Sequence, residues 1–144
     1  MSTVEALQEA LAAEHAAIHV YGTLGAATSL SATPELYERV SLAWAGHRGR
    51  RDALEVELRG LGEEPVGTRA AYDAPGPVGT PEQVSATAAL LEQRCASTYA
   101  ALVAATSGAR RRAAVAVLTE TAVAVLGFGG AAEPLPGLGL GQQG

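Results

Sequence analysis

The sequence contains no lysine and a single cysteine, and aromatic residues make up only 4% of its 144 residues. The ten basic residues are all arginines, against fifteen acids, so the net charge of −5 provides no basic surface for nucleic acid. The lone Cys95 excludes an internal disulfide and agrees with a reducing compartment. The first residues lack the basic segment and apolar core of a signal peptide. We therefore expect a cytoplasmic protein that binds neither nucleic acid nor membrane.

Hydrophobic residues make up 48% of the chain, which is enough for one domain with a sizeable core. Capping residues, prolines and glycines divide it into four helical segments, so the predicted fold is all-α. The last segment is apolar on every side, which is typical of a core helix or a membrane helix, and we favour the core. The four helices are expected over about residues 3–28, 34–60, 81–106 and 109–128.

The connection between the second and third helices is long and rich in glycine and proline. Residues 62–79 can span roughly 55–60 Å at about 3.3 Å per residue, whereas the helix before them is roughly 40 Å long. Two hairpins joined by one long crossover describe the ferritin-like form of the antiparallel four-helix bundle. We expect residues 1–130 to form this bundle and residues 131–144 to form a Gly/Pro-rich C-terminal tail.

A carboxylate lies in the middle of the apolar stripe of the first helix. Leu7, Leu11, Glu14, Ile18 and Tyr21 recur at intervals of four and three residues and therefore share one helix face. A charge at the centre of such a face is costly to bury. It requires a cation, a metal or a proton nearby, so the partner of this glutamate is the main functional question.

Polar residues also interrupt the other three helices near their midpoints. On the third helix, Glu92 is the central member of a stripe that also contains Tyr99. On the second helix, His47 and Arg51 stand where apolar residues are expected, and Glu120 is the only charged residue in the middle of the fourth helix. All four helices thus carry a titratable residue at mid-height.

An internal repeat relates the first and third helices. Residues 14–28 match residues 92–106 at a constant offset of 78 positions. The offset aligns the two central glutamates and pairs Tyr21 with Tyr99. The two helices are therefore predicted to be pseudo-equivalent.

These midpoint residues resemble the ferritin-like di-iron carboxylate proteins, in which two helices each supply a Glu and the other two each supply Glu-x-x-His. More closely, the segments EHAAIHVYG, HRGRRDALE, YDAPGPV, LEQRC-x3-Y and the terminal PGL are similar to a ferritin-like domain family of actinobacterial proteins with no assigned function. The resemblance extends from about Ala6 to Leu138.

The di-iron pattern is incomplete in this chain. Trp44-x-x-His47 replaces Glu-x-x-His on the second helix, and Glu120-x-x-Val123 replaces it on the fourth. We expect the Trp44 indole to occupy the space of the lost carboxylate. A histidine with carboxylates suits one divalent ion, Fe, Mn or Zn. The resemblance implies that the remaining ligands converge on one position: Glu14, His47 and Glu120, with Glu92 beside them.

A metal-free arrangement is the interpretation that we favour. Arg51 lies one turn from His47 on the same seam, and its guanidinium can clamp a carboxylate where a metal would otherwise be required. Arg94, Tyr21 and Tyr99 are the other expected partners. The degenerate di-metal site would then be a buried Glu/His/Arg polar network.

Two classes of function remain open at this point. In the first, the protein is a structural or interaction module, expected to be a homodimer, with no catalytic residue and no cofactor. In the second, it is a mononuclear metal-binding protein or oxidase-like enzyme that uses Glu14, His47 and Glu120. His15 and His19, one turn apart, are expected to be solvated, and Cys95 to be a small core residue. The sequence does not indicate a substrate.

Overall fold

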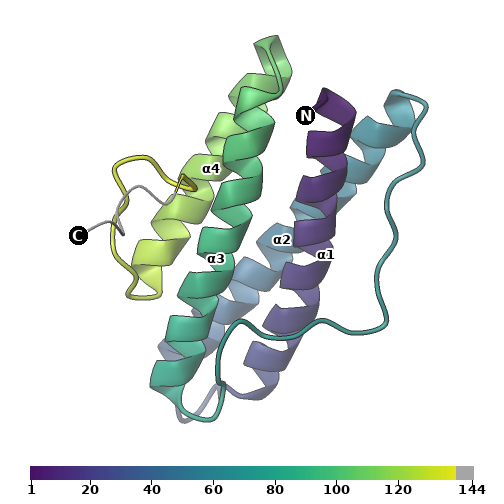
Figure 1. Ribbon diagram of the computed structural model, residues 1–144. Helices are drawn as coiled ribbons and strands as arrows, with labels where there is room; N and C mark the ends of the chain where they lie inside the picture. The colour runs from purple at the N-terminus through teal and green to yellow at the C-terminus, as the bar shows by residue number, and fades with distance from the viewer. Residues whose placement is uncertain (139–144) are drawn as a thin grey trace.

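The computed structural model describes residues 1–138, so the end of the predicted tail, residues 139–144, lies outside the described part of the chain. Within residues 1–138 there are four helices and no strand, which confirms the all-α prediction. The helices begin where the sequence predicts, to within one residue, and the first and third end slightly earlier than predicted. They are α1 (Thr3–Ala26), α2 (Pro34–Gly60), α3 (Pro81–Ala104) and α4 (Gly108–Gly127) (Figure 1).

The helix starts follow from local hydrogen bonds. Ser2 Oγ accepts a hydrogen bond from Glu5 N at 3.1 Å, and the Glu5 carboxylate accepts one from Ser2 N at 2.6 Å, which completes the predicted capping box of α1. Thr80 Oγ1 accepts a hydrogen bond from Gln83 N at 3.2 Å at the start of α3. Thr33 precedes α2 but does not cap it, because its hydroxyl instead accepts a hydrogen bond from Ser29 N in the preceding turn.

The four helices form two hairpins joined by a long crossover. α1 packs against α2, α3 packs against α4, and α1 also packs against α3. After α2 the chain runs back along α1 for most of the length of the bundle before α3 begins (Figure 1). Gln8 holds this crossover to α1, because its amide donates to Glu64 O and accepts from Val66 N, both at 2.8 Å. None of the four helices is long and apolar enough to cross a membrane.

The side between α2 and α4 is the open side of the bundle, because these two helices are not closely packed. Three arginines extend across it. Arg39 donates to Gly127 O at 2.5 Å, Arg50 to Glu120 at 3.0 Å, and Arg110 to Glu57. The prediction of a core position for the fourth helix is therefore wrong. Of its 20 residues only three are buried, since it packs mainly along one edge of α3: Ala114, Thr121 and Val125.

The core consists of two apolar clusters with a polar layer between them. One cluster surrounds Tyr21, Leu24, Val40, Val84 and Phe128. The other contains Leu7, Leu11, Leu54, Leu58 and Leu102. The buried charged residues at mid-height of α1, α2 and α3 lie where the two clusters meet. The tail folds back on α3, where Gly137 adopts φ 81° and lies against the backbone of Ala96, leaving no room for a side chain.

Candidate functional site

Three helices each place one ionisable side chain in the polar layer. Glu14 comes from α1, His47 from α2 and Glu92 from α3, and each side chain is at most 1% exposed. Each occupies the position in its helix stripe where an apolar residue would complete the core. The tight packing of α1 with both α2 and α3 brings the three groups into direct contact.

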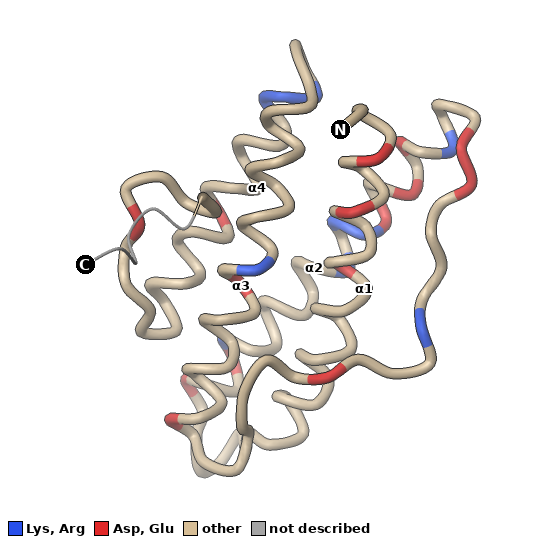
Figure 2. The backbone as a smooth tube through the Cα atoms, viewed as in Figure 1, with Lys and Arg blue, Asp and Glu red and all other residues tan. Residues whose placement is uncertain are grey.

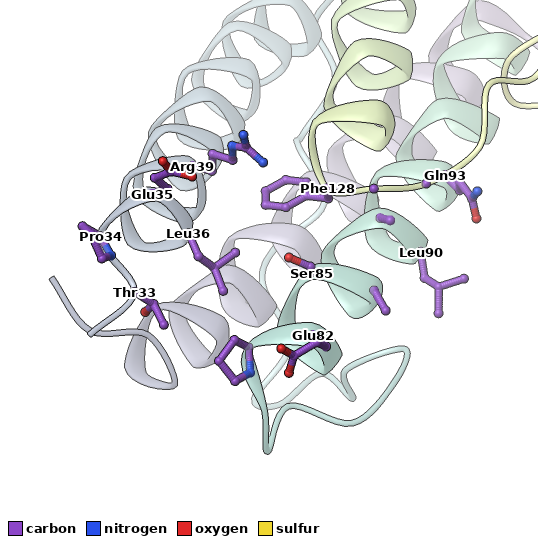
Figure 3. A pocket seen from close by; sticks show the side chains of 15 residues that line it. Thr33, Pro34, Glu35, Leu36, Arg39, Glu82, Ser85, Leu90, Gln93 and Phe128 are labelled. Carbon is purple, nitrogen blue, oxygen red and sulfur yellow. The ribbon is translucent and has the colours of Figure 1, made fainter. Parts of the chain in front are cut away.

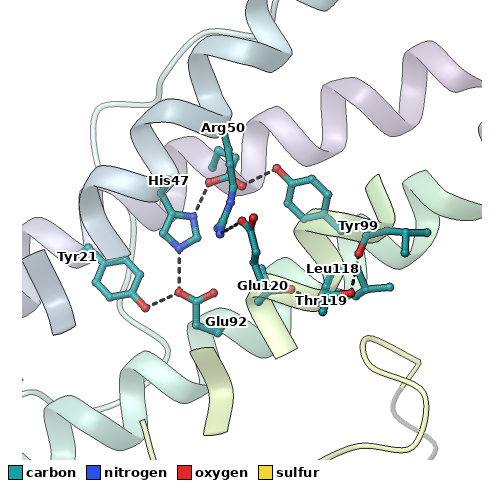
Figure 4. Close-up of polar contacts among 11 residues, drawn as sticks. Tyr21, His47, Arg50, Glu92, Tyr99, Leu118, Thr119 and Glu120 are labelled. Carbon is teal, nitrogen blue, oxygen red and sulfur yellow. Dashed lines mark hydrogen bonds and ion pairs between the residues drawn. The ribbon is translucent and has the colours of Figure 1, made fainter. Parts of the chain in front are cut away.

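The three groups form a continuous chain of hydrogen bonds with two tyrosines (Figure 4). His47 Nδ1 lies 2.5 Å from Glu14 Oε2, and His47 Nε2 lies 2.9 Å from Glu92 Oε1. The Tyr99 hydroxyl donates to Glu14 Oε1 at 2.7 Å, and the Tyr21 hydroxyl donates to Glu92 Oε1 at 2.5 Å. The order along the chain is therefore Tyr99, Glu14, His47, Glu92, Tyr21.

The network has the pseudo-twofold symmetry of the sequence repeat. Tyr21 on α1 donates to the glutamate of α3, and Tyr99 on α3 donates to the glutamate of α1. The tyrosines and glutamates that the repeat aligns are thus exchanged between the two helices. His47 bonds both halves and comes from α2, outside the repeat.

Both ring nitrogens of His47 face a carboxylate oxygen. When both carboxylates are ionised they only accept hydrogen bonds, so each nitrogen then donates one and the ring is an imidazolium. Burial alone would lower the pKa of His47, but the hydrogen bonds to Glu14 and Glu92 and their negative charges outweigh it and raise this pKa to about 9. The histidine is therefore a cation that bridges two carboxylates at neutral pH.

The neighbouring acidic groups remain protonated. Burial and the charge of Glu92 raise the pKa of Tyr21 far above its usual value, and burial and the charge of Glu14 do the same for Tyr99. Burial also raises the pKa of the Cys95 thiol. Both tyrosines therefore act as hydrogen-bond donors, and Cys95 is a neutral core residue rather than a nucleophile.

Arg50 supplies the positive charge that the sequence analysis assigned to other arginines. Its side chain is 17% exposed and donates to Glu120. Burial opposes its charge, but the negative charge of Glu14, the hydrogen bond to Glu120 and the negative charge of Glu92 raise the pKa of Arg50. The charges of Glu14 and Glu92 act on this guanidinium, while its hydrogen bond goes to the exposed Glu120, so Arg50 lies at the edge of the network. It is the functional residue that the sequence analysis missed.

The structure corrects the predictions for Arg51 and Arg94. Arg51 turns to the adjacent Asp52, with Nη2 2.7 Å from its carboxylate, and Arg94 is exposed on α3. Successive residues of a helix point about 100° apart, so the residue before Arg51, Arg50, faces the open side of the bundle, where it bonds Glu120 and feels the charges of the buried carboxylates. The arginine expected in the core is present one position earlier.

Glu120 and Trp44 lie apart from the three buried groups. The Glu120 side chain is 62% exposed and bonds Arg50 at the rim of α4, because α4 is set away from α2. Trp44 does not occupy a vacated ligand position: it is 38% exposed and lies under the guanidinium of Arg48, 4.6 Å from the ring centroid. Its position in the helix repeat directs the indole away from the network, toward solvent.

The prediction of solvated histidines is wrong for His15. This residue is only 5% exposed, and its Nε2 donates to Val66 O at 2.9 Å, because the crossover covers this face of α1. His19 remains exposed and contacts the ring of Tyr72 at a centroid distance of 5.5 Å. The two histidines thus have separate partners.

The side chains of the polar layer do not fit a resident metal ion in this arrangement. A metal binds a histidine nitrogen through its lone pair, and in the imidazolium form of His47 both nitrogens carry a proton, so neither has a lone pair to offer. Within residues 1–138 no three His, Cys, Asp or Glu side chains are arranged to hold a metal. Glu92 Oε2 is the exception to an otherwise satisfied layer, because it is buried without a hydrogen-bond partner.

Two concave regions flank the network along the open side. A cavity of about 120 Å³ lies between α2 and α4 and is bordered by Arg50, Tyr99 and Arg110. A wider groove of about 910 Å³ lies at the other end of this side, and Arg39 and Phe128 lie next to each other in its lining (Figure 3). Of the five residues in the buried hydrogen-bond chain, Tyr99 borders the smaller cavity and none lines the wider groove.

Most of the chain matches a protein family and a solved structure. A family model described as a domain of unknown function (DUF4439) matches residues 6–139. The fold is similar to the crystal structure of a conserved hypothetical protein, rv2844, from Mycobacterium tuberculosis, with a TM-score of 0.81 and 31% sequence identity. The similarity covers 88% of this chain and 87% of that one. No curated protein matches the chain.

Proposed function

Since the chain belongs to the family of the domain of unknown function DUF4439, we propose a function from the site itself: a structural or interaction module whose core is a metal-free Glu–His–Glu network. In this role the network sets the register of α1, α2 and α3 by requiring three side chains to meet at one height. A slip of one residue in any helix would strand buried charges. We propose no catalytic residue.

The observation that carries the proposal is the position of the His47 ring between two carboxylates. Its two nitrogens lie 2.5 Å and 2.9 Å from two different carboxylates, so the cation that neutralises them is the imidazolium itself. Arg50 adds a second positive charge at the edge. With these two cations present, the carboxylates do not require a metal ion to be tolerated in the core.

We further propose that the network descends from a ferritin-like di-metal site. The long crossover, the repeat of the two central glutamates and the histidine of α2 support this relationship. The missing Glu on α2 and missing His on α4 would have removed the bridging and terminal ligands. The His47 imidazolium, with Arg50 at the edge, then provides the charge that metals once supplied.

A mononuclear site for Fe, Mn or Zn is the alternative function, and one observation favours it. Glu92 Oε2 is buried and without a hydrogen-bond partner, so it is a free ligand oxygen beside His47. Glu14, His47 and Glu92 could hold an ion only after His47 loses a proton and turns a lone pair toward it. Glu120 would contribute only after leaving Arg50.

Metal analysis separates the two functions. Protein purified without chelators should contain well under one equivalent of Fe, Mn and Zn, and an excess of each ion should leave its melting temperature unchanged. His47→Gln and Glu92→Gln are the test variants, and His19→Gln is the matched control because this histidine is exposed. About one equivalent of a metal in the wild-type and control proteins, absent from the two test variants, would refute the metal-free network.

A further inference from the structure

The open side of the bundle carries a continuous uncharged stripe on α2. Leu42, Gly46, Gly49, Ala53 and Val56 recur at intervals of four and three residues, and all five are exposed. Leu42 is 67% exposed and Val56 is 70% exposed. A stripe of this kind at helical spacing is what a helix presents to another helix, and the described part of this chain does not cover it.

No contact within one protomer requires a glycine at either of the two glycine positions of the stripe. A glycine inside a helix costs roughly 1 kcal/mol relative to alanine. A Cβ added at Gly46 or Gly49 would meet no atom of the chain within 4 Å, so neither position lacks room for a side chain. Close approach of a second backbone would explain both glycines.

The facing flank of α4 is also uncharged over most of its length. Ala113 lines the cavity that also contains Ala53 of α2, so the two flanks belong to one side of the molecule. Ala116 and Val123 continue this flank, and Val123 is 62% exposed. The ion pair of Arg50 and Glu120 lies between the two flanks. The open side is therefore a broad surface with apolar flanks, and the ion pair of Arg50 and Glu120 crosses its centre, between the Arg110–Glu57 pair at one end and Arg39 at the other.

The two ends of this side have opposite charge. At one end, the first turn of α4 carries three arginines, Arg110, Arg111 and Arg112. The ion pair of Arg110 with Glu57 shows that they lie beside the last turns of α2. Acidic residues lie roughly 30 Å away along α2, at about 1.5 Å per residue. There the 910 Å³ groove is lined by two acids, Glu35 of α2 and Glu82 of α3, and by one base, Arg39, which bonds Gly127 O; Glu38 lies one turn after Glu35 on α2 (Figure 3). Figure 2 shows the basic end at the turn between α3 and α4 and acidic residues near the start of α3.

The geometry points to a homodimer in which α2 of one protomer crosses α2 of a second copy in antiparallel orientation at Gly46 and Gly49. The midpoint between the basic and acidic ends falls near residue 47, between these two glycines. A twofold axis there would bring the arginines at the start of each α4 over the acidic groove of the other copy, so the surface is complementary to itself. This proposal rests on the interaction role proposed above and identifies the partner as a second copy of the chain. It does not depend on whether the buried network holds a metal.

Oligomeric state tests the interface directly. Light scattering after gel filtration, over protein concentrations up to about 100 μM, should show a dimer of the 14.6 kDa chain. Gly46→Glu places two like charges at the twofold axis and should weaken dimerisation at least about 100-fold. Gly22→Glu is the matched control, because Gly22 also lies inside a helix with open space around it, but on α1. It should leave the dimer intact.

A charge exchange tests the orientation of the two copies. Arg112→Glu and Glu38→Arg should each weaken the dimer, and the double variant should recover most of the lost affinity, since the two positions meet across the interface. A monomer at every concentration, or a dimer that Gly46→Glu leaves unchanged, would overturn the proposal. A dimer with bound metal would refute the metal-free network and leave this interface standing, whereas a metal-free monomer would do the reverse.

Discussion

The raised pKa of His47 predicts that the protein loses stability as the pH rises above neutral. In the unfolded chain the imidazole has its ordinary pKa of 6.5, and in the folded chain this pKa is about 9. Between these values the folded state holds a proton that the unfolded state has released. The stabilisation is complete below pH 6.5 and disappears as the pH rises through 9, with a slope of about 1.4 kcal/mol per pH unit and a total of about 3 kcal/mol.

The assay is urea unfolding followed by far-UV circular dichroism at a series of pH values across this window. His47→Gln should remove most of the slope, since glutamine does not titrate. His19→Gln should retain it, because His19 is exposed and lies outside the network. Stability that is flat or rises with pH in the wild-type protein would refute the reasoning. A rise would instead indicate a metal site, since metals compete with protons for histidine.

Two further predictions concern single charges of the network. Glu14→Leu should lower the free energy of unfolding by about 3–5 kcal/mol, because it leaves the buried His47 cation and the Tyr99 hydroxyl without their acceptor; an unchanged urea midpoint would contradict this. Arg50→Met should cost about 1–2 kcal/mol and Arg51→Met less than about 0.5 kcal/mol, since Arg51 pairs only with Asp52 at the surface. Equal losses in parallel unfolding experiments would show that the assignment of Arg50 is mistaken.

The positions of the buried charged residues could be read from helical periodicity. Glu14 and Glu92 lie at the centres of apolar stripes, and His47 lies in the apolar seam of α2. In each case the apolar residues on the same helix face predict that the polar residue is buried. The helix boundaries followed equally well from local capping residues. These features depend on short-range spacing, which the sequence records directly.

The path of the chain outside the helices and the spacing between them could not be predicted in this way. His15 is buried because the crossover passes over it, and the composition of a Gly/Pro-rich segment does not specify its route. Arg50 rather than Arg51 lies at the edge of the network, because this flank of α2 faces α4, where Arg50 bonds Glu120. The apolar composition of α4 predicted a core helix, although most of the residues of this helix are exposed. Each of these outcomes depends on packing between distant segments.

The protonation of His47 is the central claim, and nitrogen NMR of the imidazole tests it most directly. In ¹⁵N-labelled protein at pH 7.5, both Nδ1 and Nε2 of His47 should show the shifts and attached protons of an imidazolium, with His47→Gln providing the assignment. Both protons should persist in the presence of excess Zn²⁺. A single unprotonated nitrogen at this pH, or loss of one ring proton on addition of the metal, would contradict a metal-free cation bridging Glu14 and Glu92.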